Sequence, residues 1–131
     1  MLERTILVVG YDTDFVNSAS TFFEGSSNWF VPANTANVAF TILTAFSVDL
    51  IILDMTANHI DALQFLIELR TVASEVPVIV VFKDGKLHIS HPQVKAVLGK
   101  PDSFEQITSY VDTFFLTQDD ANLTLSQFQI C

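Results

Sequence analysis

The sequence predicts an α/β protein built on a doubly wound parallel sheet, and two patterns along the chain lead to this prediction. Short apolar runs rich in β-branched residues are typical of strands buried on both faces of a parallel sheet. These runs alternate with segments of helical apolar spacing five times over. Right-handed crossovers would then place helices on both faces of one sheet. A length of 131 residues suits one such domain.

The first half of the chain is expected to supply three strands and two helices. The expected strands are residues 5–9, 29–31 and 50–53. Asp12 or Thr13 is expected to cap the first helix, because such side chains accept hydrogen bonds from the first helical N–H groups. The second helix is expected over residues 35–45. Pro32 lacks an N–H and is expected to break the second strand. The apolar stripe expected for helix 35–45 is Val38, Ala39, Ile42 and Leu43.

The second half is expected to add a third helix, two strands and a final helix. Asp61 is expected to cap the third helix, whose expected inner face is Leu63, Phe65, Leu66 and Leu69. Residues 76–82 and 94–98 are the remaining expected strands. Between them, residues 86–93 have a poor pattern that Pro92 interrupts, so a fourth helix would be short or distorted. His88 and His91 in this stretch are interpreted as a solvated loop pair rather than zinc ligands.

Ser103 is expected to cap the final helix, whose apolar residues cover more than one stripe. Tyr110 and Phe114 are therefore candidates for an interface with a partner or a second copy of the chain. Packing of all these apolar residues inward is the equally weighted alternative. Residues 118–131 lose periodicity, so we expect a domain over residues 1–117 followed by a tail or the start of a linker.

Composition excludes several classes of function. Six basic and fifteen acidic residues give a net charge of −9, which disfavours nucleic-acid binding. The apolar runs are far shorter than the roughly 20 residues of a membrane span, and no signal-like segment opens the chain, so we expect a cytoplasmic protein without membrane contact. The single cysteine is Cys131. Gly10 stands without the further glycines of a nucleotide-binding loop, and no nucleophile elbow is present, so no enzyme is expected.

Two residues that follow expected strands suggest a functional edge. Asp54 follows the third strand, and Lys100 with Pro101 follows the last. Ligands of open α/β sheets bind at the carboxyl ends of strands. The stretch Asp49 to Arg70, reading DLIILDMTANHIDALQFLIELR, resembles the phosphoacceptor strand and following helix of response-regulator receiver domains. This resemblance covers about residues 5–115 and implies a five-stranded flavodoxin-like sheet in the order 2-1-3-4-5, with Asp54 as phosphoacceptor and Lys100 as its partner.

The chain departs from the receiver pattern at four of its site positions. The resemblance implies two acidic residues at the end of the first strand that hold Mg²⁺ with the phosphoacceptor, but Gly10 and Tyr11 occupy these positions. Mg²⁺ binding is expected to be lost or very weak, although Asp12 could approach the pocket if the turn slipped by one residue. Phe82 replaces the family's Thr or Ser, and Val97 replaces its switch aromatic.

These departures lead to three hypotheses about function. The first is an atypical receiver that acts independently of phosphorylation as a signalling or protein-interaction module, with no cofactor or metal. In it, Asp54 and Lys100 persist as a vestigial ion pair. The second is a weak phosphoacceptor receiver that uses Asp54 with help from a partner. The third is a flavodoxin-like small-molecule binder, since a fold alone does not fix function.

Overall fold

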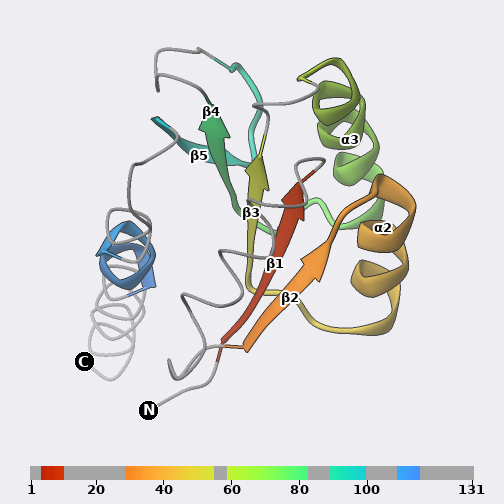
Figure 1. Cartoon of the computed structure of the whole chain (residues 1–131), viewed down its shortest axis with the longest axis horizontal. Helices are drawn as coiled ribbons and strands as arrows, with labels where there is room; N and C mark the ends of the chain where they lie inside the picture. The colour runs from red at the N-terminus through yellow and green to blue at the C-terminus, as the bar shows by residue number, and fades with distance from the viewer. Residues whose placement is uncertain (1–3, 11–28, 55–58, 83–88, 100–108, 116–131) are drawn as a thin grey trace, which may run out of the picture. The chain divides into compact units, whose positions relative to one another are not determined.

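A computed structural model describes residues 4–10, 29–54, 59–82, 89–99 and 109–115 of the chain (Figure 1). The chain divides into two compact units, residues 1–100 and residues 101–131. In the first unit, five parallel strands form one sheet in the order β2-β1-β3-β4-β5. The strands are β1 (Thr5–Gly10), β2 (Trp29–Ala33), β3 (Leu50–Asp54), β4 (Val78–Phe82) and β5 (Val94–Gly99). This topology confirms the predicted fold class and strand order.

Both faces of the sheet are buried, as the continuous apolar runs of the strands require. Side chains alternate between the faces along each strand. One face packs against α2 (Ala36–Ala45) and α3 (His59–Val72), with Leu7, Val9, Ile51, Leu53, Val78 and Val80 in the common core. The other face consists of equally buried side chains, those of Ile6, Val8, Leu50, Ile52, Ile79 and Val81. The central strands are therefore buried on both sides.

The second strand continues through Pro32, so the expectation that this proline breaks the strand is wrong. Pro32 lies opposite Val8 in the register, and Ala33 extends the strand by one further residue. β2 is at the edge of the sheet and pairs with β1. A proline is tolerated at an edge because its missing N–H can face away from the neighbouring strand.

Helix α2 begins where the sequence predicts, but its buried stripe differs. The Thr35 side chain accepts a hydrogen bond from the Val38 N–H at 3.1 Å and so caps the helix. Val38 itself is exposed, which corrects the predicted stripe. Phe40 instead packs against the core and stacks on Phe65 of α3, with ring centroids 4.9 Å apart. The position of α3 thus decides which side of α2 is covered.

Helix α3 begins at His59, so Asp61 lies inside the helix and the prediction that it caps the helix is wrong. Phe65, Leu66 and Leu69 are buried as predicted, whereas Leu63 is exposed. Two helical residues correspond to a rotation of roughly 160° between side chains. Leu63 therefore lies on the flank opposite Phe65, whose ring faces α2, and does not belong to the inner face.

The connection between β4 and β5 is held by hydrogen bonds to α3 and to the residues that follow it. Residues 89–93 are not helical, in agreement with the expected short or distorted helix, and residues 83–88 lie outside the described residues. Gln93 is buried, and its Nε2 donates to the carbonyls of Ala73 at 2.7 Å and Val76 at 2.8 Å. His91 is half-buried, with Nε2 3.0 Å from the Leu66 carbonyl. The interpretation of His91 as a solvated loop residue is therefore wrong.

The second unit contributes a helical segment at residues 109–115. Val111 and Phe115 of this segment are buried, and the rings of Phe114 and Phe115 meet edge to face with centroids 5.6 Å apart. Across the described parts of the chain, no helix has the length and apolar character needed to cross a membrane. The predicted domain boundary at residue 117 lies outside the described residues and stays a prediction.

Candidate functional site

The carboxyl ends of the strands bring three of the predicted site residues to one edge of the sheet. Gly10 ends β1, Asp54 ends β3 and Phe82 ends β4. The register pairs Gly10 with Asp54, Asp54 with Val81, and Phe82 with Gly99. Because all strands are parallel, their ends meet at the edge where open α/β sheets bind ligands.

Asp54 is the last residue of β3 and is 1% exposed. The sequence placed this carboxylate where the strand leaves the core, but the structure keeps it inside. Alternation along β3 puts Asp54 on the same face as Leu50 and Ile52, away from α2 and α3. Removing a carboxylate from water is costly unless partners compensate for the lost hydration. An ionised carboxylate at this position therefore needs compensating partners, and any phosphodonor would have to reach a group that is shielded from solvent.

Gly10 is the direct neighbour of Asp54 on this face. The two residues are paired in the β1–β3 register, and neighbouring strands lie roughly 4.8 Å apart. Alternation along β1 places position 10 on the same face as Ile6 and Val8, which is also the face of Asp54. A side chain at position 10 would thus stand beside the carboxylate of Asp54. Glycine leaves that place without any side-chain ligand.

A Mg²⁺ ion at this edge would need several oxygen ligands around it. Gly10 contributes none from its side chain, and the described residues contain no group of three or more His, Cys, Asp or Glu that could hold a metal ion. Tyr11 and Asp12 lie outside the described residues. Within the part of the chain that the structure describes, the residues at this edge do not fit a magnesium site.

Phe82 and Val97 occupy the positions that the resemblance assigns to phosphoryl contact and readout. Phe82 is half-buried and packs against the core on the α2–α3 face. Val97 is also half-buried, pairs with Val80 in the register and packs against the same core. Neither side chain carries a hydrogen-bonding group. Both therefore act as packing residues in the described structure.

Lys100 follows Gly99 directly but lies outside the described residues, as does Tyr11. The ion pair of Asp54 with Lys100 stays a prediction for this reason. Tyr110 and Phe114, the candidates for an interface, are both half-buried and lie one helical turn apart in segment 109–115. Residues four apart share one side of a helix, so the two rings can contribute to one surface.

Comparison with known proteins shows which solved structures share this architecture. No family model matches the chain, and no curated protein matches it. Among solved structures, the signal receiver domain of an HD domain-containing protein from Pseudomonas fluorescens Pf-5 superposes with a TM-score of 0.77 at 17% identity, covering 91% of this chain and 99% of that one. The chain has the fold of a response-regulator receiver domain.

Two further receivers agree with this assignment. The Francisella response regulator 1452 receiver domain is 20% identical, with a TM-score of 0.70 and coverage of 88% of this chain and 98% of that one. The response regulator TrrA from Thermotoga maritima, solved in complex with Mg(2+)-BeF, is 18% identical with a TM-score of 0.71, covering 84% and 97%. At such identities the likeness establishes the receiver fold alone, and the chemistry of the site must be argued from its residues.

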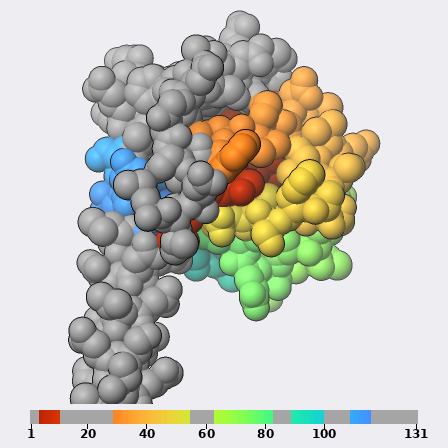
Figure 2. Space-filling model, turned by 90° about the horizontal axis from the view of Figure 1, so that it is seen from below, coloured from red at the N-terminus to blue at the C-terminus, as the bar shows by residue number. Residues whose placement is uncertain are grey.

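A second feature, which no pattern in the sequence predicts, is a cavity at the opposite, amino end of the strands. Its lining comes from the starts of β1 and β2 and from the end of α2. Figure 2 views the molecule from this end, where atoms of β1 lie between those of the β2–α2 region and those near the start of β3. Of its two aromatic residues, Trp29 begins the expected strand 29–31 and Phe46 lies outside every expected helix and strand, and neither position predicts a cavity.

Proposed function

We propose that this chain is an atypical receiver that works as a signalling or protein-interaction module independently of phosphorylation. The observation that carries the proposal is the pairing of Gly10 with the buried Asp54. The position best placed to add a second carboxylate beside Asp54 has no side chain.

The chemistry of phosphoryl transfer explains why that pairing matters. Enzymes and receivers of phosphoryl groups rely on metal ions to neutralise charge on the transferred group. A buried carboxylate without such an ion would meet an incoming phosphate of the same charge sign. The expected outcome is that Asp54 remains unmodified, as a vestige of the phosphoacceptor position.

The residues at the positions that would respond to phosphorylation also support the proposal. Phe82 offers no hydroxyl to a phosphoryl oxygen, and Val97 is too small to swing between two packing positions. Both pack into the core on the α2–α3 face. We therefore propose that partner binding, rather than a change in these residues, is the output of the chain.

For the partner we propose another protein of a signalling pathway, with Tyr110 and Phe114 as contact residues and a homodimer through this helix as one form. The net charge of −9 supports a protein partner over nucleic acid. We also propose a non-enzymatic, cytoplasmic protein without membrane contact. Substitution of Tyr110 and Phe114 by Ala, followed by measurement of mass in solution, should dissociate such a dimer, and an unchanged mass for a dimeric protein would remove this surface from the proposal.

Incubation with Mg²⁺ and acetyl phosphate tests the central claim. Intact-protein mass spectrometry should show no phosphoryl adduct on the wild-type chain, and the Asp54→Asn variant should give the same spectrum. A phosphoryl adduct that is present in the wild type and absent from the variant would overturn the proposal. That result would favour the second hypothesis, a weak phosphoacceptor that uses Asp54.

A further inference from the structure

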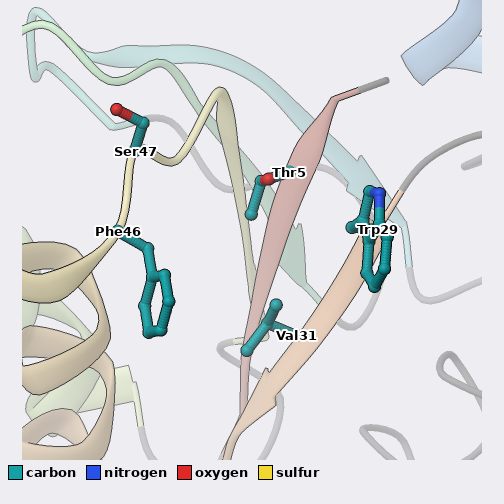
Figure 3. Close-up of a pocket in the computed structure, with 5 residues that line it drawn as sticks. All are labelled: Thr5, Trp29, Val31, Phe46 and Ser47. Carbon is teal, nitrogen blue, oxygen red and sulfur yellow. The ribbon is translucent and has the colours of Figure 1, made fainter.

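A cavity of about 360 Å³ opens at the amino ends of β1 and β2 (Figure 3). The described residues that line it are Thr5, Trp29, Val31, Phe46 and Ser47. These residues come from three segments of the chain: the first strand, the second strand and the turn after α2. The cavity lies at the end of the sheet opposite Asp54, so it is separate from the candidate site described above.

The cavity lies beyond the C-terminal end of α2, whose ten residues span roughly 15 Å, whereas the six residues of β1 span roughly 20 Å. The helix ends at Ala45, and Phe46 leaves it in an extended conformation with φ −134° and ψ 151°. The starts of β1 and β2 on this face are therefore left open beside the Phe46 ring.

Hydrogen bonds donated by backbone N–H groups hold the walls of the cavity in place. The Thr5 N–H donates to the Asp49 carboxylate at 2.8 Å, and the Asp49 N–H donates to the Thr5 carbonyl at 2.8 Å. The Trp29 N–H donates to the Arg4 carbonyl at 2.7 Å, and the Phe46 N–H donates to the Ile42 carbonyl at 2.9 Å. Both aromatic residues thus extend from fixed backbone, which lowers the cost of ordering a site on binding.

Among the described residues, the lining includes two aromatic rings and no charged side chain. Trp29 is 62% exposed and Phe46 is 66% exposed, although both are large apolar side chains. Figure 3 shows Phe46 on one side of the hollow and Trp29 on the other, with Val31 between them on the sheet. Thr5 and Ser47 carry the hydroxyl groups of the described lining, and the Ser47 hydroxyl points away from Phe46 in Figure 3. Aromatic faces of this kind bind other rings by offset or edge-to-face packing.

We infer that this cavity binds a small, uncharged aromatic molecule. Its volume falls at the lower end of the roughly 300–1,000 Å³ found for small-molecule pockets. The described lining side chains form a far smaller surface than the roughly 800 Å² that each partner contributes to a stable protein interface. None of these described lining residues is charged, and the net charge of −9 repels anions. The inference does not depend on the proposed function, because it concerns the other end of the sheet.

Trp29 makes the test direct, because it is the single tryptophan of the chain. The probe is N-phenylnaphthylamine, an uncharged aromatic dye whose emission rises in apolar surroundings. Titration into the full-length protein should quench Trp29 saturably while dye emission, excited through Trp29, increases. Its negatively charged analogue, anilinonaphthalene sulfonate, should bind at least tenfold more weakly because it carries the sign of charge that the protein repels.

Two matched variants locate the dye. Phe46→Ala removes one wall and should weaken binding about tenfold. Ile67→Ala removes a similarly exposed apolar side chain, 63% exposed on α3, and should leave the dissociation constant unchanged. The absence of saturable quenching would overturn the inference, as would an equal loss of affinity in both variants. Trp29 emission that changes with protein concentration alone, together with loss of dye binding, would show that a second copy fills the cavity and would also overturn it.

Discussion

Restoring one carboxylate at position 10 should create a metal-dependent site beside Asp54. The register places position 10 directly opposite Asp54, and alternation places both on one face of the sheet. Gly10→Asp would therefore bring two carboxylates to neighbouring strands roughly 5 Å apart. Without a cation, we expect the two charges to repel each other and to lower the free energy of unfolding.

The size of this effect follows from the distance. Two unit charges 5 Å apart at an effective dielectric constant of about 20 repel by about 3 kcal/mol. Gly10→Asn is the matched control because it adds a side chain of the same shape without the charge. The Asp variant should thus be less stable than the Asn variant by about 3 kcal/mol at neutral pH and low salt.

Urea denaturation with and without Mg²⁺ measures both parts of the prediction. Mg²⁺ should stabilise the Asp variant by about 1.4 kcal/mol when its concentration is ten times its dissociation constant. The Asn variant and the wild type should not respond. Each curve also gives the slope of the free energy of unfolding against urea concentration. Equal slopes would show that unfolding exposes a similar surface area in each variant.

Two results would refute this reasoning. Equal stability of the Asp and Asn variants in the absence of Mg²⁺ would mean that position 10 does not stand beside Asp54. Stabilisation of the wild type by Mg²⁺ would mean that the chain assembles a metal site without a carboxylate at position 10, and the proposed loss of phosphorylation control would then lose its basis.

Three further predictions concern packing and hydrogen bonds. Gln93→Leu keeps most of the side-chain volume but removes both hydrogen bonds that the amide donates. Urea denaturation should show a free energy of unfolding lower by about 2–3 kcal/mol, and an unchanged value would contradict the buried hydrogen bonds. In the same assay, Thr35→Ala should lower the free energy of unfolding by about 1 kcal/mol, and Thr35→Ser should lower it much less. Equal decreases in the two variants would exclude capping by the hydroxyl. Phe65→Ala should lower the free energy of unfolding by about 3–5 kcal/mol. A double-mutant cycle with Phe40→Ala should give a coupling energy of about 0.5–1.5 kcal/mol between the two rings, and a coupling energy of zero would contradict their stacking.

Much of the fold could be predicted because its signals are local. A strand buried on both faces is apolar at nearly every position, and the continuous apolar runs of β1, β3 and β4 therefore predict these strands. The cap of α2 is equally local, since Thr35 bonds to an N–H three residues away. The same reasoning located Asp54 at a strand end, because a charged residue terminates an apolar run.

The candidate site was only partly accessible to such reasoning. That Gly10 and Asp54 belong to one site followed from the resemblance to receiver domains. Their pairing in register and the nearly complete burial of Asp54 come from the structure. Burial depends on what neighbouring strands and helices cover, and no pattern around Asp54 in the sequence expresses it.

The sequence alone therefore determined the class of fold, the succession of strands and the absence of a second carboxylate at position 10. The tertiary structure decided which surfaces those elements cover. Pro32 is tolerated because β2 is at an edge, Leu63 is exposed because Phe65 faces α2, and Gln93 is buried through bonds to carbonyls 17 and 20 residues away. Each outcome depends on contacts between segments distant in the chain, whereas a periodic pattern reports only which side of one segment is apolar.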